Sequence, residues 1–242
     1  MPVIIVIIIA IGYVLVQYIL VNKKVTVGLS LVQQTVAYTQ AGAENGKTVL
    51  VVGDSTGVGV GAATPAESVA GLIGADFPDA SIENRAVSGA KVHDLLDVFN
   101  QLSNERAHFD VVVIQIGGND IVRFTPLKSA EQDLAQVLEQ AKHVADNVVV
   151  FSCGNVGTAP FFPFGTRWAW GVRTRAVRQI FLRQTAATQV QYIDLYREKK
   201  DDPFAQDPKR YYAADSFHPS SDGYAAWYTS ISPVVHSMNI GF

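Results

Sequence analysis

The sequence predicts an α/β fold in which helices cover both faces of a five-stranded parallel sheet and one transmembrane helix precedes the sheet. Short runs of β-branched residues alternate with longer helical stretches, as in doubly covered parallel sheets. Two of these runs, VVVIQI and VVVF, lack the apolar–polar alternation of a half-exposed strand, so both faces are expected to be buried. A long apolar run at the N-terminus predicts the additional helix.

The N-terminal run from Val3 to Val21 is apolar except for Gln17, and Lys23 and Lys24 follow it. A helix needs roughly 20 apolar residues to cross a bilayer, whereas the apolar region of a secretory signal is nearer 7–15 and follows positive charge. No basic residue precedes this run, and no small-x-small cleavage site directly follows it. We therefore expect an uncleaved anchor over residues 1–24, and by the positive-inside rule the two lysines favour a cytoplasmic domain.

Residues 25–46 are expected to form a juxtamembrane connector, with a helix allowed between Leu29 and Tyr38, and residues 47–242 the folded domain. Strands are predicted at Thr48–Val52, Ser81–Asn84, Val111–Ile116, Val148–Ser152 and Gln191–Leu195. Helices are predicted at Ala66–Asp76, Val92–Ser103, Leu127–Ala145 and Val172–Ala187, with a last helix from Asp222 that Pro233 kinks or ends.

The composition narrows the classes of function. A formal net charge of −3 argues against a nucleic-acid partner, which would need a basic surface. The single cysteine, Cys153, excludes an intrachain disulfide and a multi-cysteine metal site. The histidines other than His218 have no metal-ligand spacing, so we expect no metal, and the sequence does not indicate an oligomeric state.

Three polar loops follow the first three predicted strands. They are Gly53-Asp54-Ser55, Val87-Ser88-Gly89 and Gly117-Gly118-Asn119-Asp120. In an open α/β sheet, ligand sites gather outside the carboxyl ends of the strands, where the strand order reverses. The three loops are therefore expected to meet at one edge of the sheet.

Ser55 and His218 form a candidate nucleophile and base. Gly-Asp-Ser alone is typical of a turn, because Asp and Ser are ordinary turn and N-cap residues. A serine hydroxyl becomes a good nucleophile when an imidazole accepts its proton and a third group holds the imidazole in the right tautomer. Asp215 precedes His218 by three residues, so one turn of chain can bring its carboxylate to the imidazole.

The order and placement of these motifs resemble the SGNH (GDSL-type) hydrolase superfamily. Its four blocks correspond to GDS at 53–55, the glycine at Gly89, GGND at 117–120 and D-x-x-H-P at 215–219, over about residues 47–230. The resemblance implies a flavodoxin-like three-layer α/β/α sandwich with strand order 2-1-3-4-5. It also implies hydrolysis of esters or thioesters without metal or organic cofactor. Ser216-Phe217 departs from the family, in which Gly-Ile or a similar pair is common.

The resemblance further assigns an oxyanion hole to the backbone N–H groups of Ser55 and Gly89 and the side-chain amide of Asn119. Glycine lets a backbone N–H approach a ligand closely, and an amide donates a hydrogen bond without adding charge. Asp54 and Asp120 are interpreted as residues that brace the loops.

Two alternatives remain. Gly57-Val-Gly59-Val-Gly61-Ala62 fits a dinucleotide fingerprint after a strand, and Glu83 lies about 20 residues on, where an acid could bind a ribose hydroxyl; such a protein would be an oxidoreductase. That hypothesis leaves the other three motifs unexplained. The second alternative is a family member that has lost activity and serves as a membrane-tethered binding module.

Five aromatic residues crowd the segment after the fourth predicted strand: Phe161, Phe162, Phe164, Trp168 and Trp170. They are expected either to pack back onto the core or to form a hydrophobic wall or lid that binds an acyl chain. With an anchor nearby, lipid-derived esters such as lysophospholipids are plausible substrates, and a carbohydrate O-acetyl ester is the main alternative. Fold alone does not decide between them.

Overall fold

Five parallel strands form the centre of the domain in the computed structural model, which describes residues 2–238. The strands are β1 (Thr48–Gly53), β2 (Ser81–Asn84), β3 (Phe109–Gln115), β4 (Ala145–Phe151) and β5 (Gln191–Ile193). They are ordered β2-β1-β3-β4-β5 and all pair in parallel, for example with Val51 beside Val113. This confirms the predicted fold and its strand order.

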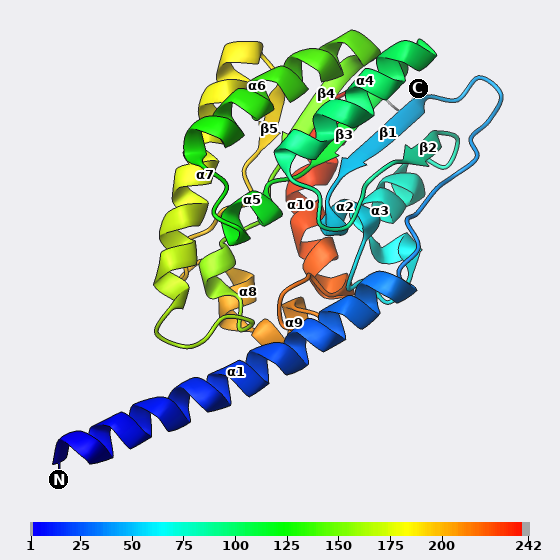
Figure 1. Cartoon of the computed structure of the whole chain (residues 1–242). Coiled ribbons are helices and arrows are strands. Elements are labelled where there is room, and N and C mark those ends of the chain that lie inside the picture. Colours follow the sequence, from blue (N-terminus) through cyan, green and yellow to red (C-terminus); the bar gives the residue numbers. More distant parts are fainter. Residues whose placement is uncertain (1, 239–242) are drawn as a thin grey trace.

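Helices cover both faces of the sheet (Figure 1). One layer contains α4 (Leu95–Glu105), α6 (Leu127–Val144) and α7 (Arg167–Thr188), and the other contains α3 (Val69–Asp76) and α10 (Ser221–Ser237). Alternate residues of β1 belong to opposite layers, since Leu50 packs with the first and Val51 with the second. Both faces of the strand are buried, which explains why it reads as an unbroken apolar run.

Short helices occupy the carboxyl ends of the strands. They are α2 (Ser55–Val58) after β1, α5 (Gly118–Val122) after β3, and α8 (Pro203–Gln206) and α9 (Pro208–Tyr211) after β5, with 3₁₀ turns at Pro65–Glu67, Val92–Asp94 and Val156–Thr158. The predicted helix at 66–76 is therefore split by Ser68, whose side chain caps α3 by accepting from Gly71 N.

Three further helix predictions differ from the structure at their ends. The helix predicted at Val92–Ser103 is a 3₁₀ turn at Val92–Asp94 followed by α4, which ends two residues later than predicted, at Glu105. The helix predicted from Val172 begins five residues earlier, at Arg167. The last helix begins at Ser221 and continues through Pro233 to Ser237, so that proline does not end it.

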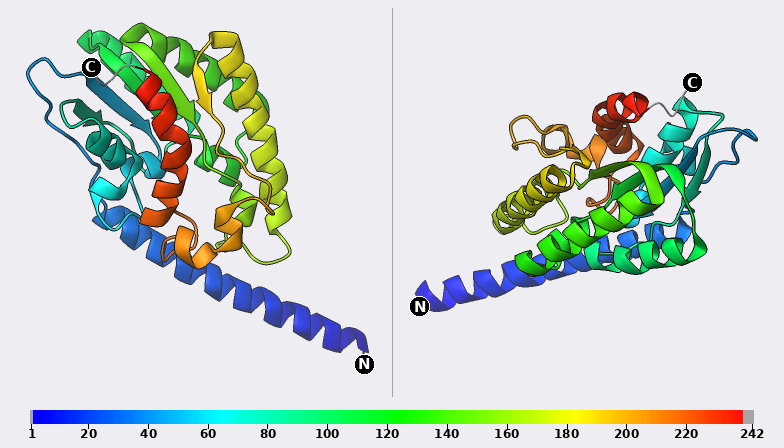
Figure 2. Two further views of the ribbon diagram at one scale, coloured as in Figure 1. Left: turned by 180° about the vertical axis from the view of Figure 1, so that it is seen from behind. Right: turned by 90° about the horizontal axis from the view of Figure 1, so that it is seen from above.

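Helix α1 (Pro2–Gln34) is longer than the apolar run that predicted it. It continues through residues 25–34 and so includes much of the segment expected to be a connector. Figures 1 and 2 show that it runs along the carboxyl-end side of the sheet, with its N-terminal part projecting beyond the domain. Residues 4–34 are long and apolar enough to cross a membrane, a property that N-terminal signal sequences share.

Candidate active site

The carboxyl edge of the sheet brings the predicted polar residues together. Ser55 is the first residue of α2, directly after β1, and Asn119 lies in α5, directly after β3. Asp215 and His218 lie in the loop between α9 and α10. The side chains of Ser55, Asp215 and His218 are buried, with Asp215 almost completely removed from solvent.

Ser55, His218 and Asp215 form a continuous hydrogen-bonded chain. Ser55 Oγ lies 2.9 Å from His218 Nε2, and His218 Nδ1 lies 2.5 Å from Asp215 Oδ2. A carboxylate accepts a hydrogen bond, so Nδ1 carries the proton and the lone pair of Nε2 faces the serine hydroxyl. In this tautomer the imidazole can accept the serine proton.

The turn between Asp215 and His218 explains their three-residue spacing. Asp215 Oδ1 accepts hydrogen bonds from the backbone N–H groups of Phe217 and His218, each at 3.0 Å. Ser216 takes a left-handed conformation with φ of 62°. Glycine adopts this conformation without strain, whereas serine adopts it at a cost in conformational energy. Ser216 is also one of the two residues at which the sequence departs from the family pattern.

The environment of Asp215 favours its ionised form. Burial alone would raise the pKa of this carboxyl, but the hydrogen bond and charge of His218 and the two backbone N–H donors outweigh burial and lower the pKa below its ordinary value. An ionised carboxylate at this place stabilises the imidazolium that forms when His218 accepts a proton.

The glycine-rich loop after Ser55 packs against the segment that carries His218. Gly61 has φ of 98°, and a side chain there would overlap the carbonyl oxygen of Pro219 and crowd His218 Cβ. Glu83, the acid that the dinucleotide hypothesis requires for a ribose hydroxyl, forms an ion pair with Arg85. The glycines thus have a structural explanation in the approach of the histidine loop, which weakens the dinucleotide hypothesis.

The three predicted oxyanion donors occupy neighbouring loops. Asn119 Nδ2 donates to the carbonyl of Ala90 at 3.0 Å, which ties its amide to the loop that carries Gly89. Gly89 has φ of 89°, a conformation that favours glycine. Ser55 and Asn119 line one cavity, and Gly89 lines a different one. Their shared role remains a prediction.

Asp54 and Asp120 brace the loops of the site. Asp54 accepts hydrogen bonds from the backbone N–H and the hydroxyl of Thr56, and Asp120 accepts from the backbone N–H of Val92. Burial is the main cause that raises the pKa of both carboxyls. Because both carboxylates accept from loop groups, the structure agrees with a bracing role.

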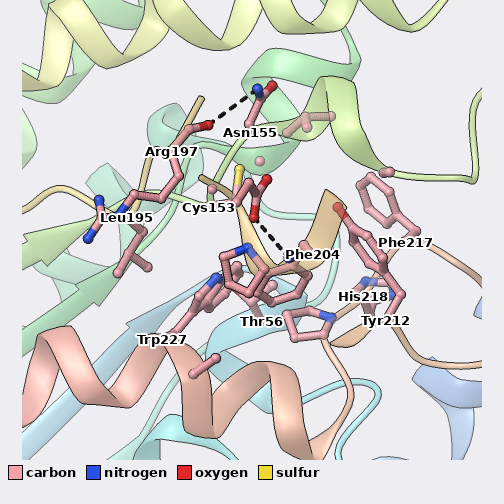
Figure 3. A pocket seen from close by; sticks show the side chains of 18 of the residues that line it. Thr56, Cys153, Asn155, Leu195, Arg197, Phe204, Tyr212, Phe217, His218 and Trp227 are labelled. Atoms are coloured by element: carbon pink, nitrogen blue, oxygen red, sulfur yellow. Dashed lines mark hydrogen bonds between the residues drawn. The ribbon is translucent and has the colours of Figure 1, made fainter. Parts of the chain in front are cut away.

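A cavity of about 190 Å³ opens beside Ser55 (Figure 3). His218 and Phe217 stand on one side of it, and Leu195 and Arg197 on the opposite side. Its apolar lining includes Cys153, Val156, Ala159, Leu195, Phe204 and Trp227, and its polar lining includes Asn155, Arg197 and Asp202.

The sequence interpretation missed these cavity residues beyond β4 and β5. The rule that sites gather at the carboxyl ends of strands applies to those two strands as well, and it could have pointed to Cys153 and Leu195. Burial raises the pKa of the Cys153 thiol to about 12, so this cysteine is not a thiolate nucleophile at neutral pH.

The five aromatic residues after β4 divide into two groups. Phe161 packs against Phe217, and buried Phe162 stacks on Trp170 with ring centroids 4.0 Å apart. Phe164 and Trp168 are 79% and 71% exposed. Among residues 2–238, the lining of the cavity beside Ser55 includes none of the five, so a substrate-binding role for them remains a prediction.

Comparison with known families identifies the domain. The model of the GDSL-like lipase/acylhydrolase family matches residues 51–226, which contain Ser55, Gly89, Asn119, Asp215 and His218. The chain belongs to this family. The matched range includes the glycine-rich loop, so family membership argues against a dinucleotide site there. Helix α1 lies wholly outside the matched range.

Among curated proteins, the GDSL-like domain is 25% identical over 185 residues to the GDSL-like esterase Rv1075c of Mycobacterium tuberculosis. The match covers 73% of this chain and 58% of that esterase, so the chain spans little more than half of the relative's length.

Solved structures share the fold at lower identity. TesA is 20% identical with a TM-score of 0.62, covering 79% of this chain and 99% of its own. A lipolytic GDSL-family protein from Veillonella parvula is 15% identical with a TM-score of 0.64, covering 77% and 97%. A variant of Axe2, an acetyl-xylooligosaccharide esterase from Geobacillus, is 21% identical with a TM-score of 0.55, covering 83% and 96%. These similarities support the GDSL-like fold.

Proposed function

We propose that this GDSL-like protein is a membrane-anchored serine esterase in which Ser55, His218 and Asp215 form the catalytic triad. The observation that carries the proposal is the buried hydrogen-bonded chain from Ser55 Oγ through the His218 imidazole to Asp215 Oδ2. Family membership supports it, because the family is one of lipases and acylhydrolases.

In this mechanism Ser55 Oγ attacks the ester carbonyl while His218 Nε2 takes the serine proton. The oxyanion of the tetrahedral intermediate accepts hydrogen bonds from the backbone N–H groups of Ser55 and Gly89 and from the Asn119 amide. The intermediate collapses, the C–O bond to the alcohol breaks, and His218 returns the proton to the leaving oxygen. Water then attacks the acyl-enzyme with His218 again as base, which releases the acid and restores Ser55.

The favoured substrate is an acyl ester, including lysophospholipid or thioester types. The apolar walls formed by Leu195, Phe204 and Trp227 can hold an acyl chain beside Ser55. An O-acetylated carbohydrate is the second candidate, because Asn155, Arg197 and Asp202 in the same cavity offer hydrogen-bonding groups and an acetyl-xylooligosaccharide esterase shares the fold.

A chain-length profile of p-nitrophenyl esters tests the proposal. We expect hydrolysis of the acetate and butyrate esters by wild type, with loss of turnover in Ser55→Ala. An optimum above the acetate favours the acyl-ester substrate, and a sharp preference for acetate favours the carbohydrate ester. Absence of any ester hydrolysis would instead favour the inactive binding module.

We further infer that residues 1–24 are an uncleaved single-pass anchor and that residues 47–242 form the catalytic domain on the cytoplasmic side. The length of α1 and the position of Lys23 and Lys24 support this assignment. Membrane fractions should retain the protein, with its N-terminus intact, after alkaline extraction. Sealed vesicles that enclose the cytoplasmic face of the membrane should protect the domain from added protease. A wholly soluble full-length protein would contradict the anchor.

A further inference from the structure

Helix α1 contacts the aromatic loop at residues 160–168 through polar groups on one of its faces. Tyr13 Oη donates to the carbonyl of Phe164 at 2.7 Å, and Lys24 Nζ donates to the carbonyl of Pro160 at 2.5 Å. Gln17 is half-buried, whereas its helix neighbours on both sides are exposed. At 100° per residue, positions 13, 17 and 24 share one face of the helix, so that face rests on the domain.

The contact at Tyr13 fixes the depth of the loop in a bilayer. Tyr13 lies eight residues before Val21, the end of the apolar run, which corresponds to about 12 Å along a helix axis. If residues 3–21 cross the bilayer, the carbonyl of Phe164 must lie level with Tyr13 to within the length of one side chain. The loop then enters the membrane by up to about 12 Å, and by less if the helix is tilted.

The loop is built in a way that suits such an environment. Its exposed large side chains are apolar, with Phe164 79% and Trp168 71% exposed. Its one charged side chain, Arg167, donates to the carbonyls of Phe162 and Pro160. An aromatic residue with a polar edge, such as tryptophan, is favoured at the boundary between headgroups and acyl chains.

Polar backbone groups of the loop also have partners within the protein. The carbonyl of Pro163 accepts from the backbone N–H and the hydroxyl of Thr166, and the Thr166 carbonyl accepts from Ala169 N. Unpaired backbone groups are costly in an apolar medium, so this pairing lowers the cost of placing a loop in the bilayer.

We propose that Phe164 and Trp168 insert into the bilayer beside α1 and form a second membrane contact that holds the carboxyl edge of the sheet, and with it Ser55, against the membrane surface. The proposal rests on the anchor inferred above. The occupant is a lipid bilayer because the contact is continuous with the apolar helix, and because neither side chain is among the residues that line the cavity beside Ser55 in the described part of the chain. An ester in the same leaflet would then reach Ser55 with little movement out of the membrane.

A fluorescent label on full-length protein in vesicles tests this contact without any need for activity. Phe164→Cys is labelled with an environment-sensitive thiol probe in phosphatidylcholine vesicles, with and without bromine on the acyl chains. Val36→Cys is the matched control, since Val36 is a 70% exposed apolar side chain beyond the end of α1. The raised pKa of the Cys153 thiol disfavours its reaction with the probe, and wild-type protein carried through the same labelling gives the background from this half-buried thiol.

The proposal predicts blue-shifted emission at position 164 and quenching by brominated lipid at least about threefold stronger than at position 36. In a second measurement, Trp168→Phe should lose most of the tryptophan quenching by brominated lipid, whereas Trp227→Phe, at a buried tryptophan, should keep it. Equal quenching at positions 164 and 36, or unchanged tryptophan quenching in Trp168→Phe, would overturn the proposal. An absence of ester hydrolysis would refute the proposed activity and leave this membrane contact standing.

Discussion

Two neighbouring regions at the carboxyl edge of the sheet are held in opposite ways. The chain of Ser55, His218 and Asp215 is buried and fixed by hydrogen bonds between side chains and within one short turn. The edge formed by α1 and the aromatic loop is largely exposed and apolar, and in the described residues its two parts are joined by hydrogen bonds from Tyr13 to Phe164 and from Lys24 to Pro160. The first region is built for a defined chemical geometry and the second for contact with an apolar medium, so substitutions in the two should have different consequences.

Ser55→Ala and His218→Ala should have the largest effect. Each should lower kcat for a soluble ester by at least about 10⁴-fold with the fold retained, because both residues act in one proton-transfer chain. Steady-state kinetics combined with circular dichroism provide the measurement. Ester hydrolysis by Ser55→Ala at the wild-type rate would contradict the difference drawn between the two regions, because the hydrogen-bonded series of Ser55, His218 and Asp215 would then have no chemical role.

Asn119→Ala tests whether the amide acts on the transition state or only braces its loop through Ala90. A bond that forms fully with the tetrahedral oxyanion predicts a decrease in kcat of roughly 100–1000-fold with little change in KM. A bracing role predicts a lower melting temperature and a higher KM with a smaller effect on kcat. Near-normal kcat would leave the backbone donors of Ser55 and Gly89 as the oxyanion hole.

Gly28 marks the place where the two regions touch. A Cβ at Gly28 would lie 3.2 Å from Asp215 Oδ2, whereas Gly12 on the same helix has no atom of the described chain within 4 Å of such a Cβ. Gly28→Leu should therefore displace Asp215 or α1 and lower kcat roughly ten- to a hundredfold.

Gly12→Leu is the matched control, because both substitutions replace glycine with leucine in one helix and differ in what the new side chain meets. It should leave kcat unchanged. Equal kinetics for the two variants would show that α1 does not press on the triad, and the two regions would then be independent.

The smallest expected effect is on the acid dependence of stability. The pKa of Asp215 is lowered in the folded protein, so its contribution to stability is fully present above the unfolded pKa of about 3.9 and is lost as pH falls through the folded value. The free energy of unfolding of Asp215→Asn should therefore fall less steeply than that of wild type between about pH 5 and pH 2.

Asp97→Asn, at an exposed position on α4, is the control for that titration and should run parallel to wild type. Chemical denaturation at each pH gives the measurement. A parallel curve for Asp215→Asn would contradict the claim that the folded site favours an ionised carboxylate.

Local sequence patterns predicted the features that depend on local structure. β2 begins and ends at the predicted residues. Buried parallel strands can be recognised in a sequence because they are continuous runs of β-branched residues. The pairing of Asp215 with His218 could be proposed because it closes within one turn. The start of α7 at Arg167 was missed because it lies within the aromatic segment that was interpreted as a loop, although Thr166 before it is a residue type that favours N-caps.

Features that depend on packing between distant segments could not be predicted from the sequence. Arg197 and Trp227 join the cavity beside Ser55 only because the segments after β5 fold back over the sheet edge. The close approach of Gly28 to Asp215 joins residues 187 positions apart in the chain (215 − 28). The split of the aromatic residues into buried and exposed groups likewise follows from the packing of Phe161 and Phe162 around Phe217.

Labelling by a fluorophosphonate tests the central claim most directly. Attack by an activated serine forms an O–P bond and expels fluoride, so the site of labelling reports which side chain is the nucleophile. We predict one phosphonyl group per chain on Ser55 by peptide mass spectrometry, no label in Ser55→Ala, and strongly reduced labelling in His218→Ala. A phosphonyl group on any other residue of the active protein, or full ester hydrolysis after complete labelling of Ser55, would contradict the assignment of Ser55 as the nucleophile.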